Sequence, residues 1–298
     1  MDLKLQGQIQ GLVAKILVRR ADLLRTAESL RSPEVFAAFN KDNAESWCRA
    51  VAGDTLVRVR MILEQNVQYI ETFVVTVVAR YLFELSVWLH LFKKDSRFGL
   101  VYYGQLLATQ ARFFEDQKAQ LEREVLLLKE FEAREADAHE GCLRAAGEPT
   151  NVAGRLRSIS DQLDYEAAKR FSLYAESACT NGYGFQAFLV ESKALPRVES
   201  ALKEIGSERD RFEQYVLAGI DDLWEKDWKW RKRAKDVGLE NEYDYIYSFA
   251  SKLLHATPAS ITTDQKNLEP EEICVFLKFI DVKVGEIIDL CKNWEPRP

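Results

Sequence analysis

Glycine and proline are scarce in this chain, which has 14 glycines and 7 prolines among 298 residues. Alternation of β-branched and polar residues, the pattern of a half-buried strand, is almost absent as well. The chain therefore offers few turns and little that favours a sheet, whereas apolar residues at helical spacing recur along its length. The sequence predicts an all-α fold, a bundle of many helices.

Histidine and paired cysteines are also rare. With 3 histidines, the chain has few side chains that exchange protons near neutral pH. The 5 cysteines are far apart and never form a Cys-x-x-Cys pair, which is typical of reduced thiols in a cytosolic protein. Glu135, His139 and Cys142 share a helical face, but three ligands are too few for a closed metal site. We expect no metal and no other cofactor, since dinucleotide, kinase and serine hydrolase motifs are missing.

The chain has a net charge of -6, so it has no overall basic charge that would attract it to nucleic acid or anionic lipid. Residues 1–6 lack the basic start and apolar core of a signal peptide. The most apolar window, residues 73–92, is interrupted by Arg80, Glu84 and His90, which would be costly in a bilayer. We therefore expect a core helix rather than a membrane span, and a cytoplasmic protein.

The order of helices follows from periodicity, caps and breaks. Asp54 is a candidate cap for a long third helix, Pro270 suits the first turn of the last one, and residues 147–151 form the clearest break. Helices are predicted at residues 5–30, 46–52, 54–92 (bent or interrupted on the way), 97–114, 117–146, 154–177, 185–193, 196–235 (with breaks) and 270–291. We expect an N-terminal helical extension at 1–53 and a helical bundle domain at 54–298, with a candidate boundary inside it at 147–153.

Two of these segments show a regular apolar face. In the last helix the apolar residues recur at steps of 4, 3, 4, 3 and 4, so this row must pack against another helix. The row consists of Ile273, Leu277, Ile280, Val284, Ile287 and Cys291. In residues 117–146 the face consists of Leu121, Val125, Leu128 and Phe131. That helix is predicted to belong to a hairpin, with a dimerising coiled coil as the alternative.

A polar stripe on the segment 243–255 carries one of the histidines. Asp244, Ser248, Ser251 and His255 follow one another at steps of 4, 3 and 4, which places them on one helical surface. His255 lies in the last turn, where the helix dipole favours imidazolium. It is either a structural, capping histidine or a general acid or base.

A second constellation lies in the apolar helix, where Thr76, Arg80 and Glu84 are four residues apart. Glu84 is within reach of the guanidinium one turn away, and a buried guanidinium must be paired. Two interpretations stay open. The pair either fixes the register of the helix or projects into a cleft with His255 as a charged site.

The third constellation is the Trp/basic segment, residues 224–235. Interleaved aromatic and basic side chains can stack on bases and neutralise phosphates. On a helix, however, its indoles could equally be buried while its charges stay in solvent. The candidate nucleic-acid-binding residues are Trp228, Trp230, Arg231, Lys232 and Arg233.

The motifs Ala79-Arg80-Tyr81-Leu82-Phe83-Glu84 and Tyr247-Ser248-Phe249-Ala250-Ser251-Lys252-Leu253-Leu254-His255 resemble those of the bacterial family called domain of unknown function 5677. Its members have an early Arg-x-x-x-Glu helix and a late Tyr…Ser…His helix, so the resemblance would span residues 56–291. It implies a distant relation to the HEPN-type helical domains of toxins and phage-defence proteins.

Active HEPN ribonucleases carry an Arg-x4-6-His motif, whose Arg and His act on the scissile phosphate across a dimer. Here Ala250 and Phe249 stand five and six residues before His255, so the chain departs from that motif. The resemblance therefore points first to a non-enzymatic interaction module of a bacterial antiviral defence or toxin–antitoxin-like system, with a protein partner or a homodimer.

Two other functions remain open. The first is a metal-independent ribonuclease in which His255 is the acid or base, Arg80 steadies the phosphate, and Glu84 and Ser251 assist. The second is binding of RNA or DNA through the Trp/basic segment.

Overall fold

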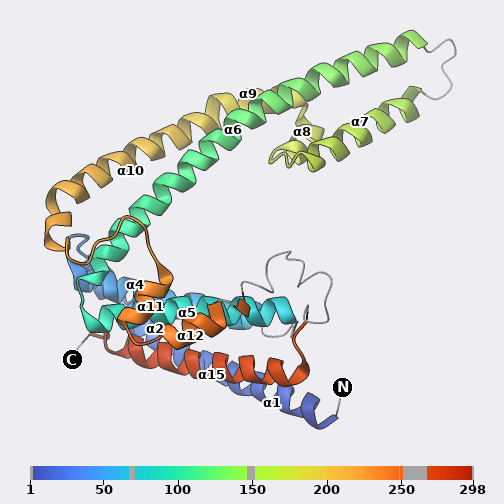
Figure 1. Ribbon diagram of the computed structural model, residues 1–298. Coiled ribbons are helices and arrows are strands. Elements are labelled where there is room, and N and C mark those ends of the chain that lie inside the picture. Colours follow the sequence, from blue (N-terminus) through green and yellow to red (C-terminus); the bar gives the residue numbers. More distant parts are fainter. Residues whose placement is uncertain (1–2, 67–70, 146–151, 248, 251–266, 297–298) are drawn as a thin grey trace. The chain divides into compact units, whose positions relative to one another are not determined.

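The chain folds into helices joined by short connections. The computed structural model describes residues 3–66, 71–145, 152–247, 249–250 and 267–296, and all regular structure in these ranges is helical. The all-α prediction is therefore confirmed. The structure divides into two compact units, residues 1–105 with 216–298 and residues 106–215 (Figure 1). The expected division at residue 54 is not the one found, because the N-terminal helices pack inside the first unit.

The first unit is built mainly on two long helices, α5 (Thr72–Lys94) and α15 (Pro270–Lys292). The other elements that lie wholly within it are α1 (Leu3–Val18), α2 (Arg20–Leu30), α3 (Pro33–Ala37), α4 (Ala44–Asn66), the 3-10 turn η2 (Leu217–Gly219), α11 (Trp230–Asp236), α12 (Glu240–Glu242) and the π-helix η3 (Tyr243–Tyr247). α15 packs along α5 and α1, while α2 packs along α4 (Figure 1).

The predicted apolar row of α15 forms the centre of this unit. All of its members from Leu277 to Cys291 are buried, and α5 supplies the facing surface. Pro270 occupies the first turn, and Glu269 and Glu272 form a capping box that satisfies the free backbone N–H groups there. Just before that turn, the Leu268 backbone N–H donates to the Thr72 hydroxyl (2.8 Å), which joins the starts of α15 and α5.

A buried carboxylate fixes α1 on α15. Asp281 is 3 % exposed and receives Lys15 Nζ at 2.7 Å and Arg19 Nε at 2.6 Å. Burial raises the pKa of Asp281, but hydrogen bonds from these two cations outweigh it and lower the pKa. Arg19 can lie across α15 because position 285 is a glycine, whose missing Cβ would stand 2.9 Å from the guanidinium.

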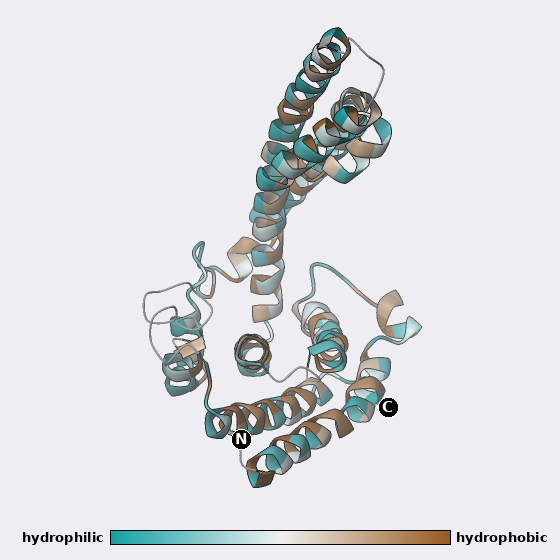
Figure 2. Ribbon diagram, turned by 90° about the vertical axis from the view of Figure 1, so that its right-hand side faces the viewer, coloured by the Kyte–Doolittle hydropathy of each residue, from teal (hydrophilic) through white to brown (hydrophobic). Residues whose placement is uncertain are grey.

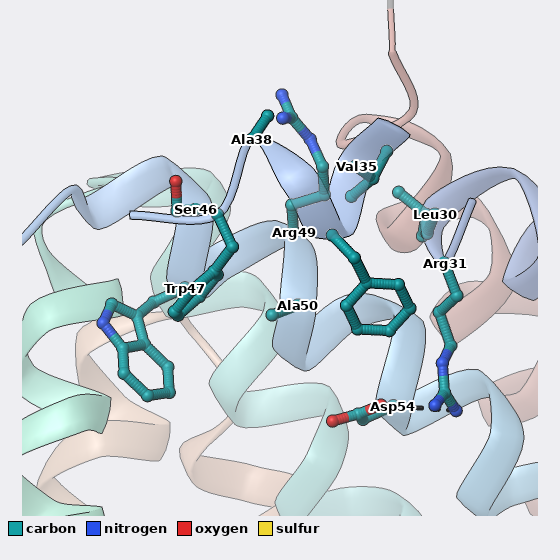
Figure 3. A pocket seen from close by; sticks show the side chains of 11 residues that line it. Leu30, Arg31, Val35, Ala38, Ser46, Trp47, Arg49, Ala50 and Asp54 are labelled. Atoms are coloured by element: carbon teal, nitrogen blue, oxygen red, sulfur yellow. Dashed lines mark ion pairs between the residues drawn. The ribbon is translucent and has the colours of Figure 1, made fainter. Parts of the chain in front are cut away.

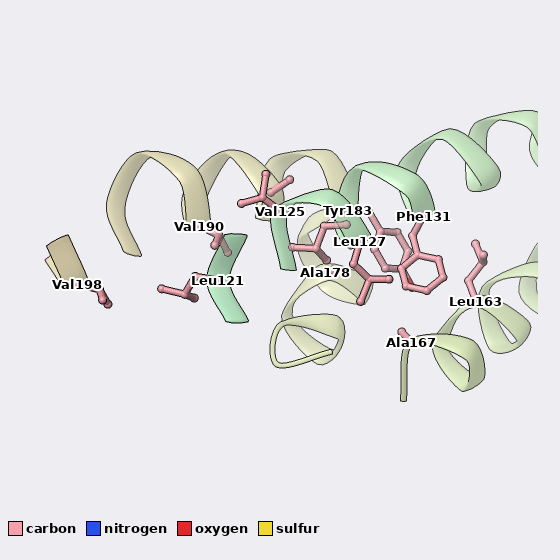
Figure 4. Close-up of a cluster of buried hydrophobic side chains, with 12 residues drawn as sticks. Leu121, Val125, Leu127, Phe131, Leu163, Ala167, Ala178, Tyr183, Val190 and Val198 are labelled. Carbon is pink, nitrogen blue, oxygen red and sulfur yellow. The ribbon is translucent and has the colours of Figure 1, made fainter. Parts of the chain in front are cut away.

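The second unit has its own core. α6 (Phe98–Ala145) begins in the first unit and supplies one side of that core; α7 (Val152–Lys169), α8 (Ala175–Asn181), α9 (Tyr183–Leu189), the π-helix η1 (Val190–Ala194) and α10 (Leu195–Tyr215) supply the other. The predicted face of Leu121, Val125, Leu128 and Phe131 is buried against them, which agrees with the hairpin (Figure 4). Hydrophobic and hydrophilic residues alternate along these amphipathic helices (Figure 2).

Several predicted helix limits were wrong. Residues 5–30 form two helices, because the chain breaks at Arg19. Asp54 is not a cap but lies inside α4, and its carboxylate pairs with Arg31 at 3.4 Å. The two helices predicted at residues 97–114 and 117–146 are parts of one helix, α6, which spans Phe98–Ala145. Local signals misled here because polar residues tolerated within a long helix resemble caps and breaks. The break at 147–151 lies outside the described residues.

α5 is the one helix among the described residues that is long and apolar enough to cross a membrane by length and composition. Half of its most apolar window is buried inside the structure, as in a core helix of a soluble fold.

Close packing at the start of α6 gives a first testable prediction. A Cβ at Gly99 would stand 2.2 Å from the Ala44 carbonyl oxygen and 3.0 Å from Cys48 Sγ. Gly99→Ala should therefore lower the free energy of unfolding by about 2 kcal/mol, as overpacking does. Gly141→Ala, in the same helix but with nothing within 4 Å of the new Cβ, is the matched control. It should be neutral or stabilise by up to about 1 kcal/mol. Equal effects of the two changes in urea unfolding would contradict the predicted clash.

Candidate functional site

The Arg80–Glu84 pair lies on the half-buried side of α5. Arg80 Nε donates to Glu84 Oε1 at 3.1 Å, and the two side chains keep 26 % and 22 % of their exposure. Burial raises the pKa of Glu84, and the hydrogen bond and charge of Arg80 oppose that rise. Thr76, one turn earlier, is fully buried and its hydroxyl donates to the Thr72 carbonyl (2.7 Å). Thr76 thus belongs to the helix packing.

A tyrosine that the sequence had not assigned a role completes this site. Arg80 Nη2 donates to the Tyr247 hydroxyl at 2.8 Å, and its guanidinium carbon lies 4.0 Å from the centre of the Tyr247 ring. Tyr243 stacks on Tyr247 with ring centres 4.7 Å apart. Both tyrosines come from the π-helix η3, a rare geometry that often occurs at functional sites. Arg80, Glu84, Tyr243 and Tyr247 are called the Arg80 cluster below.

A second arginine lies close to the Arg80 cluster. Arg231 Nη2 donates to Asp244 at 3.1 Å, and Asp244 directly follows Tyr243 in the π-helix. Burial raises the pKa of Tyr243, while the charges of Arg231 and Arg80 oppose that rise. The structure therefore brings part of the Trp/basic segment near the Arg80–Glu84 pair. In the sequence these were two separate motifs.

Ser251 and His255 lie outside the residues that the structure describes. Their predicted approach to Arg80 and Glu84 thus stays a prediction. Of the four residues proposed for catalysis, the described part of the chain places two, Arg80 and Glu84, and it places them together.

The Trp/basic segment, predicted to belong to a helical stretch with breaks, is helical only in its second half. Residues 220–229 form turns and extended chain, and α11 starts only at Trp230. Trp228 stacks on Trp88 of α5 with ring centres 4.0 Å apart, and Trp230 meets both rings edge-on. The indoles therefore take part in internal packing rather than forming an open stacking platform.

The basic side chains of this segment are paired with carboxylates. Arg233 is 3 % exposed, donates to the Leu223 carbonyl (2.9 Å) and lies within 4 Å of Glu225 and Asp236. The neighbouring ion pairs join Lys232 to Glu225, and Arg231 to Asp244 and Glu240. Arg231 and Lys232 still expose more than half of their side chains, so these two can reach a ligand.

A further polar cluster lies between α5 and α15. Glu286 is 3.3 Å from His90 Nε2, receives Lys283 Nζ at 2.7 Å and accepts from the buried Ser86 hydroxyl at 3.2 Å. His90 Nδ1 already lies 2.8 Å from the Ser86 carbonyl of its own helix. Since that nitrogen is occupied by the backbone, this Ser, His and Glu set is not arranged as a catalytic triad. Among the described residues, no group of three or more histidine, cysteine or acidic side chains could hold a metal ion.

The fold and these sites define an all-α protein. The charged side chains of its candidate sites form ion pairs and hydrogen bonds within and between helices. Residues 150–272 match the model of the family described as "Family of unknown function (DUF5677)". The match supports the predicted resemblance to this family but covers less than the expected residues 56–291. It contains Tyr243 and Tyr247, and it excludes Arg80 and Glu84. No curated protein and no solved structure matches the chain.

Proposed function

We propose that this protein is a non-enzymatic interaction module that acts through protein contacts. The observation that carries the proposal is an exposed aromatic pair on α9. Phe185 and Phe188 are 55 % and 58 % exposed, whereas Tyr183, Gln186 and Ala187 of the same helix are buried. Residues three apart share a helical face, and exposed apolar faces of this kind mark interaction sites.

The charges of the candidate sites also favour this function. Glu84 and Tyr247 take up the guanidinium of Arg80, and carboxylates pair with each basic residue of the Trp/basic segment named above. Such pairing stabilises a scaffold, and it leaves few unpaired cationic side chains that could stabilise a transition state. The setting, a bacterial antiviral defence or toxin–antitoxin-like system with HEPN-like character, rests on the family resemblance.

The test is co-purification of the full chain with its partner from the native host. Phe185→Ser with Phe188→Ser should weaken the partner's binding at least tenfold, because aromatic anchors supply most of the energy of an interface. Phe113→Ser is the matched control, since Phe113 is 61 % exposed in the same unit but lies on α6. Partner binding that survives the double change, or is lost equally in the control, would rule out the α9 face.

A metal-independent ribonuclease is the second candidate, because Arg80 and Glu84 are partly exposed rather than sealed in the core. In that mechanism His255 is the general acid or base and Arg80 steadies the phosphate. Cleavage of RNA in the presence of a chelator should then be abolished by His255→Ala, with Ser251→Ala as a milder change. Unchanged cleavage in the His255 variant would exclude this mechanism.

Binding of RNA or DNA through the Trp/basic segment is the third candidate, and the structure sharpens its test. Only Arg231 and Lys232 should be reversed to glutamate, because reversal of the buried Arg233 would unfold the segment. If this function is correct, the double reversal should weaken binding at low salt and flatten its salt dependence. A parent protein that binds neither RNA nor DNA at low salt would exclude it.

A further inference from the structure

The first unit contains a cavity of about 260 Å³ that none of the functions above uses. It lies between the end of α2, the short helix α3 and the first turns of α4 (Figure 3). Leu30, Val35 and Ala50 give it an apolar surface, and three aromatic side chains also line it, namely Phe36, Phe39 and Trp47. Phe36 and Phe39 are 58 % and 40 % exposed, so the cavity is accessible from solvent.

Polar contacts hold this aromatic lining in place. The indole N–H of Trp47 donates to the Lys41 carbonyl (2.8 Å), and its ring stacks on Tyr103 at 4.5 Å and meets Phe39 edge-on at 5.2 Å. The Ser46 backbone N–H donates to Asn43 Oδ1 (2.9 Å), which caps the start of α4. A cavity fixed in this way is largely formed before a ligand arrives, as binding pockets usually are.

The two arginines that line the cavity differ in their partners. Arg31 pairs with Asp54 at 3.4 Å and lies over the Phe36 ring at 5.8 Å, so its charge is compensated. Arg49 donates from Nε to the Trp294 carbonyl (3.1 Å). This hydrogen bond fixes the side chain, but a neutral carbonyl does not compensate its positive charge. Figure 3 shows the two guanidinium groups pointing to opposite sides of the cavity.

The terminal amino groups of Arg49 have no protein partner within the described residues. On its other side Arg49 lines a polar hollow with Glu45 and Glu295, and no ion pair joins it to either carboxylate in the described part of the chain. The guanidinium can therefore offer two parallel N–H groups to an incoming anion, the geometry that suits a carboxylate.

We infer that this cavity binds an aromatic carboxylate, with its ring among Phe36, Phe39 and Trp47 and its acid group on Arg49. The volume is below the range of roughly 300–1,000 Å³ typical of drug-sized ligands, so one ring with a short acidic arm fits. The chemistry is shared by a free aromatic acid and by a C-terminal aromatic residue of a peptide. The inference does not depend on the proposed function.

The probes are phenylacetate and phenylacetamide, together with the tripeptide N-acetyl-Gly-Gly-Phe as its free acid and as its amide. Titration calorimetry of the full chain at low salt should show each acid binding at least tenfold more tightly than its amide. The tighter of the two acids identifies the source, free acid or chain end. Equal binding of acids and amides, or no binding of either acid at millimolar concentration, would overturn the inference.

Two variants and a control locate the site. Arg49→Gln should remove the preference for the acids, and Ala50→Leu should abolish binding by filling the cavity. Arg60→Gln is the matched control, because Arg60 lies on the same helix with a half-exposed side chain paired to Glu64 (2.8 Å), outside the cavity lining. Circular dichroism checks that each variant is folded. Unchanged binding in a folded Ala50→Leu variant would place the ligand elsewhere.

Discussion

Replacing Arg233 with alanine is expected to lower the free energy of unfolding by about 3 kcal/mol. Removal of one partner from a buried ion pair costs about 3–5 kcal/mol when the other is left buried. Here Glu225 and Asp236 keep 24 % and 30 % of their exposure and can regain water, so we expect the lower end of that range. The Leu223 carbonyl also loses its donor, and the stack of the guanidinium on Trp228 (4.9 Å) is lost.

Urea unfolding followed by tryptophan fluorescence measures this effect, because the Trp88–Trp228 stack lies in the same cluster. Lys232→Ala is the control, since Lys232 pairs with the same Glu225 but is 56 % exposed. Exposed pairs contribute about 0–1 kcal/mol, so this variant should remain close to the parent. An Arg233 variant as stable as the Lys232 variant would mean that the guanidinium does not hold this segment together.

The parts of the fold that periodicity alone specifies could be predicted from the sequence. The apolar row of α15 and the Leu121–Phe131 face of α6 are buried as expected, because each repeats every three to four residues over several turns. Pro270 and the acidic residues after it mark the start of α15 unambiguously, since they satisfy the needs of a helix N-terminus.

The candidate site could be predicted only in part. Arg80 and Glu84 are four residues apart, and local spacing suffices to pair them. Tyr247 is 167 positions away in sequence, so its contact with Arg80 depends on how η3 packs against α5. The π-helix itself was not predicted, because its five residues, Tyr243–Tyr247, are too short a run to show a period of their own. Arg233 was expected on a solvated face of a helix, but residues 220–229 are not helical and Arg233 is buried.

The polar cluster of Glu286, His90, Lys283 and Ser86 also depends on how two helices pack, here α5 and α15. It gives a prediction whose expected effect on stability is close to that of Arg233→Ala. Burial alone would raise the pKa of Glu286, but hydrogen bonds from His90 and Lys283 outweigh it and lower the pKa to about 2. A carboxylate whose pKa is lowered in the folded state stabilises the fold fully at a pH above its pKa in the unfolded chain, near 4.5. This contribution is lost as the pH falls from there towards 2. Lys283, whose side chain is 6 % exposed, depends on this carboxylate as its ion-pair partner.

Glu286→Gln should therefore lower the free energy of unfolding by about 2–3 kcal/mol at pH 7, because the charge is lost while Lys283 stays buried. The difference between variant and parent should shrink steadily as urea unfolding is repeated from pH 4.5 downwards, since the parent's Glu286 then becomes protonated as well. Asp289→Asn is the control on the same helix: Asp289 is 76 % exposed and pairs with Lys292, so its effect should be under about 1 kcal/mol. A Glu286 difference that is small at pH 7, or that does not change with pH, would show that the charge of this carboxylate does not hold α5 and α15 together.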